Sequence, residues 1–160
     1  MKIIEYEDKY LEDVKDLLVE LGNYIVSIDK DKLEQVHADY RLKMTLKDLD
    51  DVKSNNGKCY LALDNKHVIG LIMGFIRQYD EFDYLDYKCP KEGVITELIV
   101  SENARSKGIG KSLMNKLEKY FKSIKCEYVI VDVFAYNDKA IKFYEKAGYH
   151  SRMETKIKKI

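Results

Sequence analysis

Two glycines two residues apart, Gly108 and Gly110, stand between an apolar run and a run with helical periodicity. Glycine at the start of a helix removes the side chain that would keep a phosphate away from the backbone. The first N–H groups of a helix have no partner within it and lie at the positive end of its dipole, so they can hold a pyrophosphate without metal. We therefore interpret this stretch as a phosphate-binding loop. It comprises Arg105, Ser106, Lys107, Gly108, Ile109, Gly110 and Lys111, whose cations add positive charge.

The ending Gly-Lys-Ser at residues 110–112 is also typical of the nucleotide-binding P-loop. A P-loop needs a further glycine five residues earlier, and Arg105 occupies that position. The motif would also follow a hairpin late in the chain instead of a first strand. Asp132, at the end of the apolar run YVIVD, supports a P-loop only weakly, because buried strands often end near an aspartate. The sequence therefore argues against an ATP or GTP site. A plain glycine-rich turn with solvated lysines stays open as the alternative.

Hydrophobic periodicity predicts the elements that must position this loop. Apolar runs predict strands at residues 2–6, 58–64, 67–76, 93–100 and 127–135, with a final strand in the tail, 149–160. Helical spacing predicts helices from Asp8 to a stop at Gly22, one or two within 28–57, one from Gly108, and one from Asn137 to Gly148. The early hairpin and the late βαβ unit predict a mixed α/β (α+β) fold with helices on the faces of one sheet.

Length and composition narrow the function classes. The chain has 160 residues, which suits a single domain over 1–160. Its 28 basic and 28 acidic residues balance, so there is no net positive charge to favour binding to nucleic acid or to a membrane surface. No apolar run is long enough to span a membrane. Cys59, Cys89 and Cys126 are far apart, which disfavours a disulfide framework or a metal site. With a charged N-terminus unlike a signal peptide, this predicts a cytoplasmic protein.

Two motifs in the C-terminal half resemble the GNAT superfamily of acetyl-coenzyme A-dependent N-acetyltransferases. The pattern Arg/Gln-x-x-Gly-x-Gly/Ala is met by Arg105, Gly108 and Gly110. The pattern Asn-x-x-Ala-x-x-Phe-Tyr-x-x-x-Gly-Tyr/Phe is met in order by Asn137, Ala140, Phe143, Tyr144, Gly148 and Tyr149. The resemblance covers Ile95 to Tyr149. One departure is Ser-Glu-Asn at 101–103, where many members carry a proline.

The resemblance implies a GNAT fold, in which the strand before the phosphate loop bulges and splays from the next strand to leave a V-shaped cleft. Leu98, Ile99 and Val100 would then offer backbone groups to the pantetheine arm of acetyl-CoA, like an added strand. One of their N–H groups would polarise the thioester carbonyl. Asn137 would bond the coenzyme arm or cap its helix, two roles that the sequence does not separate.

Catalytic roles follow from the same resemblance. Tyr144 is the matched candidate for the general acid that protonates the leaving thiolate; the alternative is an aromatic core residue. Glu97 is the candidate general base, because an amine must lose a proton before it attacks. A paired or solvated strand glutamate, with a water chain as base, is the alternative.

The amine acceptor is predicted from an acidic, aromatic segment between two strands, YDEFDYLDY. Asp80, Glu81, Asp83 and Tyr84 suit a cationic amine by charge attraction and cation–π contact. Polyamines, aminoglycosides and lysine-rich peptides all fit, whereas a solvated loop is the alternative. A non-catalytic coenzyme A sensor or interaction module is the competing function, and a homodimer is left open.

Overall fold

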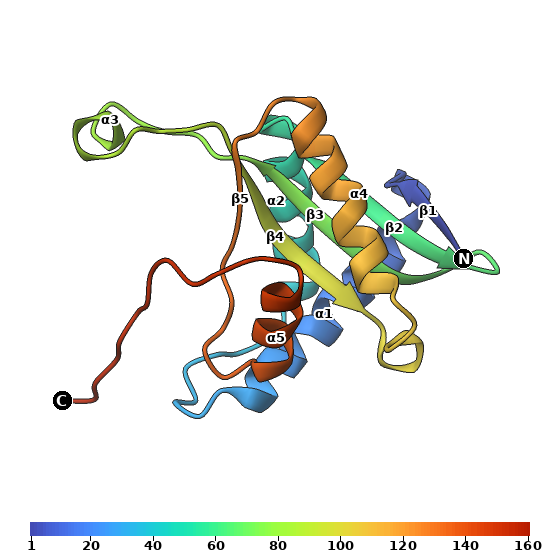
Figure 1. Ribbon diagram of the computed structural model, residues 1–160. Helices are drawn as coiled ribbons and strands as arrows, with labels where there is room; N and C mark the ends of the chain where they lie inside the picture. Colours follow the sequence, from blue (N-terminus) through green and yellow to red (C-terminus); the bar gives the residue numbers. More distant parts are fainter.

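The computed structural model describes residues 1–160, and its five strands form one sheet in chain order (Figure 1). They are β1 (Lys2–Glu5), β2 (Lys58–Asp64), β3 (His67–Ile76), β4 (Glu92–Val100) and β5 (Tyr128–Val131). Strands β1 to β4 are antiparallel, and β4 and β5 are parallel. The helix α4 (Ile109–Ser123) is the crossover that parallel neighbours need. The predicted mixed sheet is confirmed.

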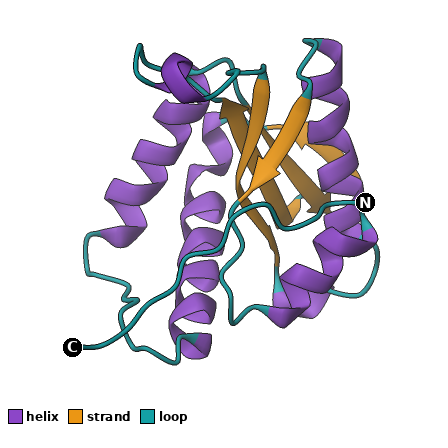
Figure 2. Cartoon of the chain, turned by 60° about the vertical axis from the view of Figure 1, so that its left-hand side comes forward, coloured by secondary structure: helices purple, strands orange, loops and turns teal.

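Helices cover both faces of the sheet (Figure 2). On one face, α1 (Leu11–Ile28) and α2 (Tyr40–Ser54) bury Cys59, Leu61, Leu71 and Met73. On the other, α4 buries Tyr60, Ala62 and Ile72. Burying each large apolar side chain contributes about 1.5–3 kcal/mol. A slip of one residue would move each set to the opposite face, where it would pack against the wrong helices, so the alternation fixes the register.

One irregularity in β4 shapes the site. Glu97 pairs with Met73 but Ile95 pairs with Gly74, so Thr96 is an extra residue that β3 does not match. On its other side, β4 pairs with β5 only from Glu92 to Ile95. The second half of β4 therefore continues without β5, and α5 (Asp138–Lys146) lies beside it (Figure 1). This is the bulged, splayed geometry that the resemblance implied.

Three sequence-based expectations are corrected by the structure, and a fourth is narrowed. Helix α1 does not stop at Gly22 but continues to Ile28, and a Cβ built on Gly22 lies 3.2 Å from the Tyr40 ring, so close packing explains this glycine. Within 28–57, where one or two helices were predicted, the structure has one, α2. Strand β5 ends at Val131 because β4 has diverged from it. The tail, 149–160, forms no strand: Tyr149 packs against the core, and residues 150–160 are exposed.

Short elements complete the fold: the 3₁₀ turns η1 (Asp8–Tyr10) and η2 (Glu102–Ala104), and the one-turn helix α3 (Asp83–Asp86). Helix α3 lies in the long loop between β3 and β4, which extends away from the rest of the molecule (Figure 1). None of the helices combines the length and the apolar character that a membrane crossing requires.

Candidate active site

The loop between η2 and α4 presents a row of unused backbone donors. No acceptor in the protein takes the N–H groups of residues 106–111. Ser106 and Gly108 have φ angles of 65° and 75°, and such left-handed residues curl successive N–H groups around one point. The row continues into the first turn of α4, where the helix dipole is positive. The loop therefore has the geometry of an anion-binding cradle.

Neither glycine of the cradle is required by contacts within the protein. A Cβ added to Gly108 would meet no atom within 4 Å, and one on Gly110 would lie 3.6 Å from the nearest atom, on the Phe143 ring. Only the left-handed φ of Gly108 favours glycine there. The absence of side chains leaves the backbone donors open to a ligand.

The cations of the loop have different roles. Lys107 and Lys111 are exposed and form no ion pair. Arg105 is committed elsewhere: its Nε donates to the Val100 carbonyl at 2.9 Å, and its Nη2 lies 3.1 Å from the Glu20 carboxylate. Arg105, predicted as one of three cations around the phosphate, is thus paired with an acid in this structure. Its side chain ties the loop to β4 and α1, and Lys107 and Lys111 supply the unpaired charge.

The free edge of β4 lies next to this cradle. Ser101 N–H donates to the Ile69 carbonyl of β3 at 3.0 Å. Since backbone groups alternate in direction along a strand, Ile99 also faces β3, whereas Leu98 and Val100 face the opening. The Val100 carbonyl is taken by Arg105. Beyond Ile95 no strand pairs with β4 on that side. The N–H groups of Leu98 and Val100 therefore remain for a ligand, and Ile99 is buried against α1 and α2.

Asn137 is a helix cap in this structure. Its Oδ1 accepts the N–H of Ala140 at 3.1 Å and the hydroxyl of Tyr24 at 3.2 Å. Helix α1 is thereby joined to the start of α5. The capping role that the sequence left open is thus observed, and the side-chain NH₂ group stays available as a donor.

Tyr144 is buried but its hydroxyl is unpartnered. The side chain is 8% exposed and packs edge-on against Phe143 and Tyr149. No buried polar side-chain atom of the protein lacks a partner, so this unbonded oxygen reaches accessible space. Burial, and then the charge of Glu97, raise the pKa of Tyr144 to about 12. The phenol therefore keeps its proton at neutral pH.

Glu97 follows the bulge in β4 and forms no hydrogen bond or ion pair. Its oxygens are not sealed from solvent, by the same reasoning as for Tyr144. Burial, and then the charge of Asp48, raise the pKa of Glu97 to about 7. A carboxylate with this pKa can accept a proton near neutral pH. The structure thus places Glu97 close enough to Tyr144 for its charge to act on that phenol.

Two further residues, Asp48 and Tyr40 of α2, were missed by the sequence analysis. The pKa of Asp48 is raised to about 6, mainly by burial and also by Asp51, against an opposing effect of Lys47. The pKa of Tyr40 is raised by burial, then by the charges of Glu97, Asp48 and Glu34. The spacing in the sequence could have identified Asp48, because it falls between Thr45 and Val52 at helical spacing, on the side of the helix that faces the core.

The acidic loop does not join this cluster. Asp80 and Asp83 accept hydrogen bonds from the loop's own backbone, and Tyr84 is exposed. The loop adjoins the start of β4, five residues before Glu97, which corresponds to about 16 Å along a strand. Glu81 lies in the same exposed turn. The structure therefore does not bring the residues of the acidic loop close to Glu97.

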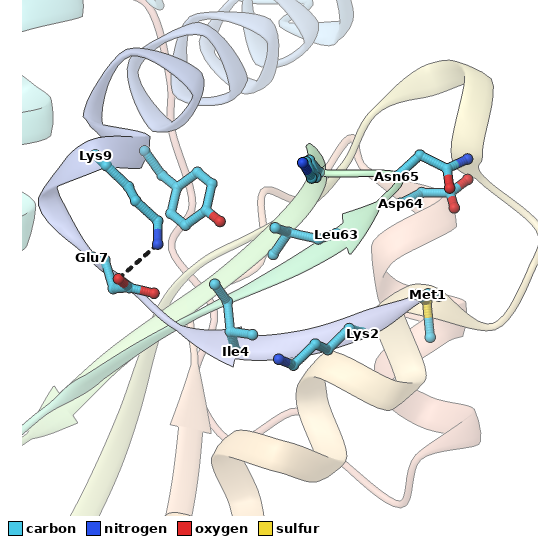
Figure 3. Close-up of a pocket in the computed structure, with 10 residues that line it drawn as sticks. Met1, Lys2, Ile4, Glu7, Lys9, Leu63, Asp64 and Asn65 are labelled. Atoms are coloured by element: carbon cyan, nitrogen blue, oxygen red, sulfur yellow. Dashed lines mark hydrogen bonds and ion pairs between the residues drawn. The ribbon is translucent and has the colours of Figure 1, made fainter.

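Two surface hollows also lie outside the cluster. One of about 430 Å³ is at the outer edge of the sheet, where Lys2, Glu7 and Lys9 line it with the β2–β3 turn (Figure 3). None of the expected site residues lines it. Another, of about 400 Å³, lies between the end of α2 and β5 and is lined by Phe75, Val94 and Asp132 among others. No group of His, Cys, Asp and Glu side chains is arranged to hold a metal ion.

Comparison with known proteins agrees with this geometry. The family model "Acetyltransferase (GNAT) family" matches residues 23–149. An uncharacterized N-acetyltransferase of Methanocaldococcus jannaschii is 29% identical over 126 residues, which are 69% of this chain and 77% of that protein.

Solved structures share the whole fold. A mutant of the BH1408 protein of Bacillus halodurans superposes with a TM-score of 0.87 at 19% identity, over 100% of this chain and 99% of that one. The aminoglycoside N-acetyltransferase AAC(6')-Iy, solved with CoA, superposes with a TM-score of 0.73 at 16% identity, over 99% and 93% of the two chains. The family match, covering most of the chain, identifies this protein as a member of the GNAT acetyltransferase family and thus as an acyltransferase.

Proposed function

We propose that the protein transfers the acetyl group of acetyl-CoA to a primary amine by direct attack of the amine on the thioester. The observation that carries this proposal is the row of free N–H groups at 106–111 beside the unpaired half of β4, together with two side chains that have no hydrogen-bond partner, Glu97 and Tyr144. A phosphate site, a free strand edge and an acid–base pair are the parts that this reaction needs.

The coenzyme would bind along the unpaired half of β4. Its pyrophosphate would accept hydrogen bonds from the cradle, with Lys107 and Lys111 as counter-charges. Its pantetheine arm would pair with the N–H groups of Leu98 and Val100, as an added strand does. One of those N–H groups would stabilise the oxyanion that forms on the thioester carbonyl. The free NH₂ group of Asn137 would donate to the arm.

Each proton has a place in this reaction. Glu97 would take the proton that the protonated amine must lose, and the nitrogen lone pair would then form the C–N bond. As the C–S bond breaks, the sulfur would take the phenolic proton of Tyr144. The raised pKa values of Glu97 and Tyr144 support these assignments, because each keeps its group in the required form near neutral pH. Exchange of protons with solvent would then deprotonate Glu97 and reprotonate Tyr144.

The relatives support the donor and the type of acceptor. The GNAT family match points to acetyl-CoA, and one structural neighbour was solved with CoA. The sequence relative is named as an N-acetyltransferase. A nitrogen nucleophile is therefore the acceptor that we propose, with aminoglycosides among the cationic amines to be tried first.

Two measurements test the proposal. Calorimetry should show binding of coenzyme A and none of ATP with Mg²⁺. A thiol-release assay with a panel of amines should show turnover that depends on an amine. Binding of coenzyme A without amine-dependent turnover would indicate the alternative, a coenzyme A sensor. Tight ATP binding without coenzyme A binding would refute the cradle assignment.

A further inference from the structure

The loop that leads from β4 to the cradle, residues 101–107, has little buried surface to fix its shape. Ala104 is buried in the core, but residues 102, 103 and 105–107 are exposed. The η2 turn within it is closed by two backbone hydrogen bonds of its own, from Ala104 to Ser101 and from Arg105 to Glu102. A segment with so few apolar contacts depends on polar contacts with its surroundings to keep one conformation.

Glu20 of α1 supplies such a contact at both ends of the η2 turn. Its Oε1 accepts the backbone N–H of Glu102, the first residue of the turn, at 3.1 Å. The same oxygen accepts a hydrogen bond from the Nη2 of Arg105, the residue that follows the turn, at 3.1 Å. One carboxylate oxygen therefore clamps both ends of the turn that leads directly into the cradle.

Arg105 transmits this constraint to β4. Its Nε donates to the carbonyl of Val100, the last residue of the strand, at 2.9 Å. The guanidinium also lies over the ring of Tyr24, 5.8 Å from the ring centre. Tyr24 is four residues after Glu20 and thus on the same side of α1. Because the guanidinium is planar and rigid, contacts with α1 at two points and with β4 at a third fix its orientation.

Tyr24 extends the same support to the start of α5. Its hydroxyl donates to the Oδ1 of Asn137 at 3.2 Å, which leaves the amide NH₂ group free. Through Glu20 and Tyr24, one side of α1 thus joins the loop before α4 to the start of α5. These are two of the segments that the coenzyme would contact in the proposed function, so α1 holds them in a fixed arrangement.

We propose that Glu20 is a positioning residue for the coenzyme, because it fixes Arg105 and the η2 turn so that the N–H groups of residues 106–111 are arranged before the pyrophosphate arrives. This inference rests on the proposed binding of acetyl-CoA. Glu20 does not bind the coenzyme itself, since a carboxylate would repel a pyrophosphate. It acts by ordering the loop in advance, because a disordered loop would lose conformational freedom on binding. Lys107 and Lys111 supply the attraction.

Calorimetry of coenzyme A with three variants tests the inference. Glu20→Ala removes both hydrogen bonds and should weaken binding about 5- to 10-fold, between the effect of an exposed ion pair and that of a buried charged hydrogen bond. Glu20→Gln keeps an oxygen acceptor and should restore part of the affinity. Glu12→Ala is the matched control, because Glu12 lies on the same helix and pairs with Lys15 and Arg41 at 2.7 and 3.0 Å. Its affinity should stay within about twofold of the wild type.

A shorter donor, S-acetylpantetheine, separates positioning from a merely structural role, because it carries the thioester but no pyrophosphate. With n-butylamine as the acceptor, Glu20→Ala should raise the KM for acetyl-CoA about 5- to 10-fold and leave kcat unchanged. Its kcat/KM for S-acetylpantetheine should stay within about twofold of the wild type. An equal loss with both donors would make Glu20 a structural residue and overturn the inference.

The wild-type measurement distinguishes this inference from the proposed function. Unchanged or tighter binding of coenzyme A to Glu20→Ala would overturn the role of Glu20 and leave the cradle intact. Failure of coenzyme A to bind the wild type would overturn the proposed function, and the inference with it.

Discussion

Glu97 of β4 lies close enough to Tyr144 of α5 for its charge to act on the phenol: after burial, the carboxylate contributes to raising the pKa of Tyr144 to about 12. The two residues come from elements that the chain separates by a whole crossover helix. They meet because β4 bulges at Thr96 and loses β5 as a partner after Ile95. The relationship places a candidate base with a pKa of about 7 near a candidate acid with a pKa of about 12.

Tyr144→Phe tests the acid. The substitution removes one hydroxyl and keeps the ring that packs between Phe143 and Tyr149. Coenzyme binding and thermal stability should hardly change, while the single-turnover rate should fall by roughly 10²–10⁴-fold, the usual contribution of a general acid. Rates within about twofold of the wild type would assign the phenol to the core alone, with water as the proton source.

Glu97→Gln tests the base through its pH profile. The wild-type kcat/KM should rise with pH as Glu97 loses its proton, with an inflection near its pKa of about 7. The groups that surround it are Asp48 and Tyr40 from α2 and Tyr144 from α5. The variant should be slower and should lose the inflection. An inflection that persists at the same pH in Glu97→Gln would assign the base to another group.

The same carboxylate predicts how stability depends on pH. The pKa of Glu97 in the folded protein, about 7, lies above its ordinary value of 4.5. The folded state therefore binds this proton more tightly, so its stabilising effect is complete below pH 4.5 and is lost as the pH rises through 7. At pH 8, Glu97→Gln should raise the free energy of unfolding by on the order of 1–3 kcal/mol. Urea unfolding at pH 8 and pH 5 should show a smaller gain at the lower pH. An equal or larger gain at pH 5 would contradict a desolvated carboxylate.

Gly108→Leu tests the cradle, and Gly148→Leu is its control. Both glycines have a left-handed φ, 75° and 94°, and a Cβ at either would meet no protein atom within 4 Å. Each variant should lose about 1–2 kcal/mol of stability from backbone strain. Only Gly108→Leu should weaken coenzyme A binding in calorimetry, because only its side chain occupies the space before the free N–H groups. Equal affinity in the two variants would place the pyrophosphate elsewhere.

The parts of the site that sequence predicted are those encoded locally. The spacing of Gly108 and Gly110 before a helical run indicated the cradle, and the motif from Asn137 to Tyr149 placed Tyr144. The hairpin around Asn65 was found because its two strands are adjacent in the chain. In each of these cases, the residues that determine the local structure lie within a few positions of one another in the sequence.

The parts that were missed depend on distant partners. Arg105 is neutralised by Glu20, which lies in another layer, and no local pattern reveals that pairing. Asp48 is distinguished only when α2 packs against the sheet. The apolar run after Val131 predicted a longer strand, but strand formation requires a neighbour and β4 has diverged there. The acidic loop looked suited to a cation, yet its position at the far end of β4 follows from topology alone.

The measurement that tests the central claim most directly is a product analysis in a single turnover. Protein saturated with acetyl-CoA is mixed with n-butylamine, and the N-acetylamine and free thiol are quantified by mass spectrometry and a thiol reagent. Direct transfer predicts equal amounts of the two products, no acetylated protein, and no thiol release when the amine is omitted. Thiol release without N-acetylamine, or an acetylated side chain that forms before the amine is added, would contradict direct attack by the amine.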